Sequence, residues 1–360
     1  MAARTLHGAR IEVAPGALAT LGVRLRDHWP THRVVCIADD TVAALYGTAA
    51  RAALGGDLTL LTFPAGEASK TRATWAALTD ELLARGFGRD TVVVGLGGGV
   101  TTDLAGFVAA TYLRGVPLVL VPTSLLGMID AAIGGKTGVD TPAGKNLVGA
   151  FHHPELVLID PALLATLPVS ARRAGLAEAI KHGVIADAAY LDDIVAQLPR
   201  LLGDGPLDDA ATRALVDRSV AIKVDIVARD EREAGLRQVL NVGHTLAHAL
   251  EQVTGYRLAH GEAVAIGMVL EARLAEDLGH AHPGLADRIA EVCTAAGLPV
   301  TLPSGVDPAA VVAATHTDKK SRGGTVRYSL PTAIGTIATA SGGFTVAVPD
   351  AAVRRILTQM

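Results

Sequence analysis

The first half of the chain alternates short runs of β-branched apolar residues with longer segments of helical periodicity. The runs that predict strands are Ile11–Val13, Val34–Ile37, Leu58–Phe63, Val92–Gly95, Pro117–Val121 and Leu156–Ile159. The helical patterns between them cover Ala17–Asp27, Asp40–Leu54, Lys70–Arg85 and Thr101–Leu113. This alternation predicts a mostly parallel sheet covered by helices, of the Rossmann-like α/β class. Ligands of such sheets bind at the carboxyl ends of the strands.

The second half of the chain has a different pattern. Long Ala- and Leu-rich segments of helical period follow one another over Val169–Ile185, Ala189–Leu202, Asp208–Ala228, Val239–Thr254, Glu262–Asp277 and Gly284–Ala296. They predict an all-α domain, so we expect an α/β domain over residues 1–165 and a helical domain over residues 166–360. A length of 360 residues is typical of two domains. Alternating runs between Thr325 and Val348 are β-like, but the sequence does not place them.

Composition excludes several classes of protein. Half of the residues are hydrophobic and 19% are charged, which excludes a disordered chain. A formal net charge of −4 provides no basic field for nucleic acid or a membrane surface. Cys36 and Cys293 are too few for a disulfide framework. No apolar run reaches the roughly 18 residues that span a bilayer, and Met1 precedes no signal-peptide core, so we expect a soluble cytoplasmic protein.

The stretch from Asp130 to Asn146 combines two lysines, two acids and an amide with four glycines, and it follows the predicted strand that ends at Val121. Glycines let a backbone approach a ligand closely, and ammonium groups supply counter-charge, so the stretch favours an anionic ligand. Gly135-Lys136-Thr137 matches the end of a nucleoside-triphosphate loop. That motif also requires a glycine six residues before its lysine, where this chain has Asp130, and this difference disfavours a triphosphate site.

A second glycine run, Gly95-Leu-Gly-Gly-Gly-Val100, follows the predicted strand at Val92 and opens a helix containing Asp103. Such a junction brings backbone N–H groups and a helix N-terminus against a phosphate. The match to a dinucleotide fingerprint is imperfect, because Val100 stands where glycine or alanine is required. A plain tight turn is the alternative. Asp39, at the end of an earlier strand, favours the dinucleotide because its carboxylate is suited to a ribose hydroxyl.

Histidines with the spacing of metal ligands occur in the helical half. His244 and His248 lie four residues apart, on one face of a helix, and His260 follows shortly before another helix. Together with Glu178 they form the ligand set of a catalytic zinc with an open position. The alternative is ordinary surface histidines. Glu178 and Lys181, at i and i+3, form either a surface ion pair or, given their apolar surroundings, part of a site.

The chain resembles the 3-dehydroquinate synthase family of sugar phosphate cyclases. The resemblance rests on six motifs in family order: Gly97-Gly-Gly-Val, Gly134-Gly-Lys-Thr-Gly, Gly144-Lys-Asn, Gly175-Leu-Ala-Glu-Ala-Ile-Lys181, Leu240-Asn-Val-Gly-His-Thr and His260-Gly-Glu-Ala-Val. It implies a fold similar to that of iron-dependent and glycerol dehydrogenases, with an NAD-binding α/β domain followed by a helical metal-binding domain. Asp140 departs from the pattern, because asparagine is usual there.

The resemblance also implies roles for individual residues. Zn²⁺ (or Co²⁺) is expected on Glu178, His244 and His260. The catalytic residues are expected to be Asp130, Lys136, Lys145, Asn146, Lys181 and His248. Substrate binding is expected at Lys223, Arg237, Asn241, Lys320 and Arg114, the last reaching into the site of a neighbouring subunit of a homodimer. NAD is expected to contact Asp39, Glu67, Lys70, Gly98, Gly99, Asp103, Thr123, Lys136 and Lys145.

The activity implied by the resemblance is conversion of 3-deoxy-D-arabino-heptulosonate 7-phosphate to 3-dehydroquinate and phosphate, within the shikimate pathway. One alternative is a cyclase that acts on sedoheptulose 7-phosphate or an amino analogue. Lys223 and Arg237 disfavour the former, because sedoheptulose 7-phosphate has no carboxylate for two cations to bind. A second alternative is a metal-dependent polyol or glycerol-phosphate dehydrogenase, and a third is a non-catalytic binding module.

Overall fold

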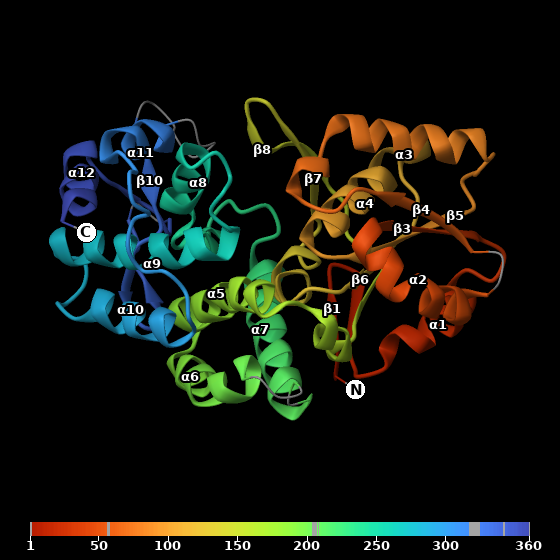
Figure 1. The fold of residues 1–360 in the computed structure, drawn as a ribbon, viewed down its shortest axis with the longest axis horizontal. Helices are drawn as coiled ribbons and strands as arrows, with labels where there is room; N and C mark the ends of the chain where they lie inside the picture. The colour runs from red at the N-terminus through yellow and green to blue at the C-terminus, as the bar shows by residue number, and fades with distance from the viewer. Residues whose placement is uncertain are drawn as a thin grey trace. The chain divides into compact units, whose positions relative to one another are not determined.

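The computed structural model describes residues 2–55, 58–203, 207, 209–316, 325–340 and 343–359 (Figure 1). The chain forms two compact units, and the first comprises Met1–Leu167 with Asp208–Val224. The second comprises Pro168–Leu207 with Asp225–Met360. The first unit therefore includes a segment that a single boundary near residue 165 leaves out. The division into 1–165 and 166–360 stays a prediction.

The first unit is built on a seven-stranded sheet with the strand order β1-β2-β9-β6-β5-β3-β4. The strands are β1 (Ala2–Leu6), β2 (Ala9–Val13), β3 (Arg33–Asp39), β4 (Thr59–Phe63), β5 (Thr91–Gly97), β6 (Leu118–Pro122) and β9 (Leu156–Ile159). Neighbours pair in parallel except for β1 and β2, which form an antiparallel hairpin. The six predicted strands are confirmed. The central β5, β6 and β9 are buried along their whole length, which explains their continuous apolar runs.

Helices α1 (Leu21–His28), α2 (Asp40–Leu54), α3 (Arg72–Ala84) and α4 (Gly99–Thr111) occupy the connections between these strands. Strand β3 lies between β4 and β5. The chain leaves β3 through α2 toward β4 on one side, and leaves β5 through α4 toward β6 on the other. The strand order therefore reverses between β3 and β5, and ligands of open parallel sheets bind at such a point.

An antiparallel hairpin of β7 (Lys136–Thr141) and β8 (Gly144–Phe151) follows a π-helical turn, η4 (Gly127–Ala131). The sequence does not predict this hairpin, because the glycines of the Asp130–Asn146 stretch indicate a ligand-binding turn. Gly138 in that stretch and Gly149 after it permit close strand pairing. A Cβ on Gly149 would lie 2.1 Å from the carbonyl oxygen of Thr137, and one on Gly138 would lie 2.7 Å from that of Val148. The two backbones therefore approach more closely than any side chain permits.

The second unit is mostly helical (Figure 1). Its helices are α5 (Val169–Ala186), α6 (Ala188–Leu202), α8 (His244–Val253), α9 (His260–Asp277), α10 (Leu285–Ala295), α11 (Pro308–Thr315) and α12 (Asp350–Thr358). Helix α7 (Asp209–Arg229) belongs in part to each unit. The predicted helix at Val239–Thr254 begins only at His244, because Leu236–Asn241 forms a 3₁₀ turn, η6. The β-like runs of the tail form two short ladders, β10 (Arg327–Tyr328) with β13 (Val346–Ala347) and β11 (Pro331–Ala333) with β12 (Thr336–Ile337).

One apolar core joins helices α8, α9, α11 and α12 with these ladders, and Leu250, Leu270 and Val311 lie fully buried within it. The core fixes the helices that carry the histidines of the predicted metal site. Among the helices of the described residues, none combines the length and the apolar character needed to cross a bilayer.

Candidate active site

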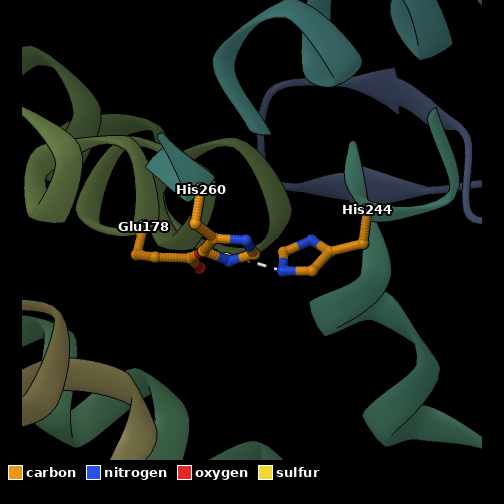
Figure 2. Close-up of side chains that lie close together, drawn as sticks. All are labelled: Glu178, His244 and His260. Atoms are coloured by element: carbon orange, nitrogen blue, oxygen red, sulfur yellow. Dashed lines mark ion pairs between the residues drawn. The ribbon is translucent and has the colours of Figure 1, made fainter. Parts of the chain in front are cut away.

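Three predicted metal ligands converge in the second unit. Glu178 on α5, His244 at the start of α8 and His260 at the start of α9 offer ligand atoms that all lie within 4.8 Å of one another. Figure 2 shows the three side chains pointing toward one another from separate segments. The Nε2 atoms of His244 and His260 lie 3.4 and 3.5 Å from Oε1 of Glu178. One carboxylate and two imidazoles form a donor set suited to Zn²⁺ or Co²⁺.

The outer nitrogens of both histidines are held by oxygen atoms. Nδ1 of His244 lies 3.1 Å from the carbonyl oxygen of Val242, and Nδ1 of His260 lies 3.5 Å from the carboxylate of Glu251. When both rings are neutral, as metal ligation requires, the single proton of each belongs on Nδ1, because Nδ1 faces an oxygen that only accepts and Nε2 faces the metal position. Each Nε2 lone pair is then directed at the centre of the cluster. This is the arrangement that surrounding groups impose on metal-binding histidines, so the residues fit a metal ion.

A buried cation lies beside the cluster. The ammonium of Lys181, one turn after Glu178 on α5, forms an ion pair with the Glu178 carboxylate, and both side chains are at most 1% exposed. Burial raises the pKa of Glu178, but Lys181 and His244 outweigh it and hold that pKa well below the usual value. Glu178 is therefore a carboxylate at neutral pH, as a metal ligand must be. The surface ion pair considered from the sequence is excluded.

The other predicted site residues of the second unit that the structure describes lie beside this cluster or in the segment just before α8. The ring of His248 lies 5.6 Å from that of His244 and 6.3 Å from that of His260, centroid to centroid. Arg237 is 2% exposed, and its guanidinium donates to the carbonyl oxygen of Glu231 at 2.5 Å. The side-chain amide of Asn241 donates to the carboxylate of Glu233.

The loop that carries Arg237 is organised by one carboxylate. Asp230 accepts hydrogen bonds from the backbone N–H groups of Ala234, Gly235 and Arg237 at 3.0, 2.8 and 2.9 Å. These bonds hold the pKa of Asp230 below its usual value, against the effect of burial. In the sequence Asp230 belongs to a charge run that is indistinguishable from a solvated helix face. The structure shows instead that it orders the loop from the end of α7 to η6.

In the first unit, the glycine run lies where the strand order reverses. Gly97 ends β5, Gly98 precedes α4, and Gly99 is its first residue. No side chain among the described residues caps this helix N-terminus. A Cβ on Gly97 would lie 2.3 Å from Oγ1 of Thr101, so the turn is too tight for any other residue. Asp39, at the end of β3, caps α2 through the backbone N–H of Val42 at 3.0 Å and accepts from Thr101 at 3.3 Å.

Charged side chains line the neighbouring turn. Lys70 is buried, and its ammonium lies 2.5 Å from the carboxylate of Asp103 on α4. Burial lowers the pKa of Lys70, but Asp103 and Glu67 outweigh it and raise that pKa. Glu67 lies 3.5 Å from the ammonium of Lys145 on β8. The predicted NAD contacts Glu67, Lys70, Asp103 and Lys145 are thus brought together.

The hairpin is fixed to this group by Asp140 on β7. Its backbone N–H donates to the carbonyl oxygen of Lys70 at 2.7 Å, and its Oδ1 accepts from the backbone N–H of Asn146 at 2.8 Å. Asn146 has a φ of 53°, an uncommon value for a residue other than glycine. Asp140 therefore holds Asn146 in a left-handed conformation, next to Lys145.

The rest of the predicted residues of the first unit occupy separate positions. Lys223 on α7 forms an ion pair with Asp130 in η4 and donates to its carbonyl oxygen at 2.5 Å. Thr123 is buried directly after β6, and Lys136 is the exposed first residue of β7. Arg114 is exposed and has a φ of 70°. Lys320, which was predicted in the second unit, lies outside the described residues.

Two buried acids beside the cluster have no role in the sequence-based prediction. Glu251 lies on α8, and only the structure shows its contact with His260. Its spacing offered a signal, since it lies seven residues after His244 and therefore on the same helical face. Glu271, a fully buried acid on α9, accepts the backbone N–H of Gly243 at 2.6 Å. Nothing in its local sequence distinguishes it from a surface acid of an amphipathic helix.

Comparisons with known proteins agree with this architecture. The family model described as 3-dehydroquinate synthase N-terminal matches residues 60–174, and the one described as 3-dehydroquinate synthase C-terminal matches residues 175–321. A 3-dehydroquinate synthase from Symbiobacterium thermophilum is 47% identical over 326 residues, which are 89% of this chain and 90% of that protein.

Solved structures of sugar phosphate cyclases share the whole fold. ValA, a 2-epi-5-epi-valiolone synthase from Streptomyces hygroscopicus with NAD⁺ and Zn²⁺ bound, is 32% identical with a TM-score of 0.87, covering 100% of this chain and 98% of its own. A 2-deoxy-scyllo-inosose synthase has a TM-score of 0.90 at 23% identity, covering 99% of this chain and 100% of its own, which supports the fold alone. With two family models side by side along most of its length and a relative 47% identical to it, the chain belongs to the 3-dehydroquinate synthase family.

Proposed function

We propose that the protein is a 3-dehydroquinate synthase, which converts 3-deoxy-D-arabino-heptulosonate 7-phosphate to 3-dehydroquinate and phosphate. The observation that carries the proposal is the convergence of Glu178, His244 and His260, each with the orientation that a metal ligand requires. The identity of 47% to a synthase over most of the chain supports the choice of reaction.

Glu178, His244 and His260 would hold Zn²⁺ or Co²⁺. A bound divalent ion supplies Lewis acidity, which lowers the pKa of substrate hydroxyls and polarises a carbonyl group. The structural basis for ligation is the anionic Glu178 carboxylate together with two imidazoles whose Nδ1 atoms face oxygen acceptors. Lys181 and His248, which lie next to the same cluster, would orient substrate hydroxyls and move protons between them.

NAD would bind along the reversal of strand order in the first unit. A bound nicotinamide supplies a hydride acceptor, and in its reduced form the donor that restores the substrate's oxidation level. The N-terminus of α4, with the tight turn at Gly97, Gly98 and Gly99, is suited to the pyrophosphate. Asp39, at the end of β3, would accept a hydrogen bond from a ribose hydroxyl. The cluster of Glu67, Lys70, Asp103 and Lys145 would complete the cofactor contacts, together with Thr123, whose backbone N–H donates to the carbonyl oxygen of Gly97 at 2.9 Å.

The substrate carries a carboxylate and a phosphate, and the predicted residues supply cations and amides for both. Arg237 would bind the carboxylate through its planar guanidinium, together with Lys223. Lys136, Asn241 and His248 would hold the phosphate, with Lys320 and the Arg114 side chain of a second subunit. Asp130, Lys145 and Asn146 would orient hydroxyls. Holding both ends of an open chain in place favours its closure into a ring, since two reacting groups are kept in contact.

The strained backbone at Arg114 supports a homodimer. Leu113 and Arg114 both have positive φ values, of 48° and 70°, and Arg114 is exposed. Consecutive residues in this conformation are unfavourable, persist only where the surrounding structure fixes them, and are concentrated at functional sites. We therefore expect Arg114 to complete the phosphate site of a second copy of the chain. A cytoplasmic location completes the proposal.

Incubation with the heptulosonate phosphate, a divalent metal ion and catalytic amounts of NAD⁺ tests the reaction. We expect one phosphate to be released for each carbocyclic product formed, with both measured by NMR. NADH should not accumulate. A polyol dehydrogenase would instead accumulate NADH in proportion to product. Turnover of sedoheptulose 7-phosphate in place of the heptulosonate phosphate would favour the alternative cyclase. His244→Ala should abolish metal binding and turnover together, and activity retained without metal would reject the metal centre.

A further inference from the structure

Glu271 is a buried acid to which the proposed function assigns no role. It lies on α9 within the helical unit, it is fully buried, and it is neither a predicted metal ligand nor a predicted substrate contact. A buried carboxylate is unfavourable unless it is compensated by hydrogen bonds or opposite charge. Its Oε2 accepts the backbone N–H of Gly243 at 2.6 Å. Gly243 directly precedes the metal ligand His244, at the N-terminus of α8.

The same region of α9 carries a backbone-to-backbone contact. A Cβ on Gly267 would lie 2.0 Å from the carbonyl oxygen of Gly243 and 3.2 Å from the backbone nitrogen of Ala247. A Cβ on Gly243 would lie 2.8 Å from Met268 Cγ. Gly243 also has a φ of 81°, which glycine adopts without strain. The first turn of α8 is therefore seated on α9 with no space for a side chain at either glycine.

These features lie on one face of α9. His260, Gly267 and Glu271 are separated by seven and then four residues, spacings that bring side chains to the same side of a helix. At one end of this face His260 offers its Nε2 to the metal cluster. Farther along, Gly267 and Glu271 hold the turn that presents His244. The distance between the two histidine ligands therefore depends on how α8 is seated on α9.

We propose that Glu271 is a positioning residue of the metal centre. Through the N–H of Gly243 it fixes the first turn of α8 against α9, and this sets the separation of His244 from His260. A carboxylate suits the task because an ionised acceptor forms a stronger hydrogen bond than a neutral one, and because the N-terminus of a helix favours negative charge. The inference rests on the proposed metal centre, but it is independent of the substrate.

A graded series of variants at Glu271 tests the proposal. Glu271→Gln keeps the size of the side chain and one oxygen acceptor, whereas Glu271→Leu removes the acceptor. Binding of Co²⁺ would be measured in competition with a chromophoric chelator, and the visible spectrum of bound Co²⁺ would report ligand geometry. We expect affinity to fall in the order Glu, Gln, Leu, with a loss of about 10- to 100-fold for leucine, the range typical of groups that orient metal ligands. The Co²⁺ spectrum of the leucine variant should also change.

Glu12 provides the matched control. It is another fully buried carboxylate, but it lies on β2 in the first unit and pairs with Arg10 and Arg24 at 2.5 and 2.9 Å. Glu12→Gln should lower thermal stability and leave Co²⁺ affinity and spectrum unchanged. An equal loss of affinity in this control would overturn the proposal, since general destabilisation would then explain the effect.

The possible results separate the role of Glu271 from the existence of the metal centre. Absence of Co²⁺ binding by the wild-type protein would reject both. Wild-type binding with unchanged affinity and spectrum in Glu271→Gln and Glu271→Leu would reject only the role of Glu271. If the leucine variant does not fold, the glutamine variant decides, because it conserves volume: reduced affinity supports the proposal, and wild-type affinity overturns it.

Discussion

Lys181→Met would remove an ammonium group from a carboxylate that is already shielded from water. Glu178 and Lys181 are 0% and 1% exposed, so their ion pair is buried and little screened by salt. Breaking a buried pair by removing one partner destabilises a protein by about 3–5 kcal/mol, because the remaining charge is uncompensated. Because the protonated ring of His260 also faces Glu178 in the metal-free protein, we expect a loss of about 3 kcal/mol, the lower end of this range, measured by urea unfolding in the presence of a chelator.

A divalent ion on Glu178 supplies the positive charge that the variant lacks. The difference in stability between Lys181→Met and the wild type should therefore shrink when metal is added. By thermodynamic linkage, a recovery of about 3 kcal/mol corresponds to metal affinity about 100-fold higher in the variant than in the wild type. The variant should thus bind metal more tightly while it turns over substrate more slowly.

The control is the surface pair of Arg85 with Glu81 on α3, in which both side chains are about half exposed. Arg85→Met should change the free energy of unfolding by about 0.5 kcal/mol or less. Two results would refute the reasoning about Lys181: an equal loss of stability with and without metal, or weaker metal binding by Lys181→Met.

Three further predictions concern the same site. Glu251→Gln should lower metal affinity by about 10- to 100-fold, measured by chelator competition, because the charge that orients His260 is lost; unchanged affinity would contradict the role of Glu251. Burial lowers the pKa of His260, but Glu178 and Glu251 outweigh it and raise it from 6.5 to about 10. Its bound proton therefore stabilises the metal-free fold below pH 6.5, and this contribution is lost as the pH rises through about 10. Because metal displaces that proton, the affinity for Zn²⁺ should rise about tenfold per pH unit over this window. Metal binding should also release protons, which a weakly buffered solution would reveal. An affinity that does not change with pH would show that the metal-free His260 is neutral. Arg237→Lys should raise KM for the heptulosonate phosphate about 10- to 100-fold, because a charge-assisted hydrogen bond contributes about 1.5–3 kcal/mol. Metal affinity should not change. A KM like that of the wild type would place the substrate carboxylate elsewhere.

The elements that the sequence predicted are those with a strong local signal. Continuous apolar runs in β5 and β6 indicate strands that are buried on both faces, and both were found. The hairpin of β7 and β8 was missed because its glycines resemble a loop. Helix α8 begins later than predicted, since the apolar period continues through the 3₁₀ turn of η6 and does not distinguish it from an α-helix.

The sequence predicted only those residues of the candidate site that have a strong local signal. The types and spacings of Glu178, His244 and His260 are those of metal ligands, so the sequence alone indicates them. Glu251 and Glu271 have no such strong signal, because an acid on an amphipathic helix is most often exposed to solvent. Asp230 and Asp140 likewise act through backbone N–H groups, and a sequence pattern does not show which backbone a carboxylate reaches.

By itself the sequence determined the class of each half, the order of most helices and strands, and the chemical types available for a site. These properties follow from local periodicity and residue chemistry, which can be recognised from residues that are neighbours along the chain. The tertiary structure alone decided that a carboxylate on α5 and imidazoles on α8 and α9 meet within 4.8 Å. It also decided that Lys181 pairs with Glu178 out of water and that Glu271 reaches Gly243. The physical reason is that these contacts depend on how helices pack, and packing is set by the whole core.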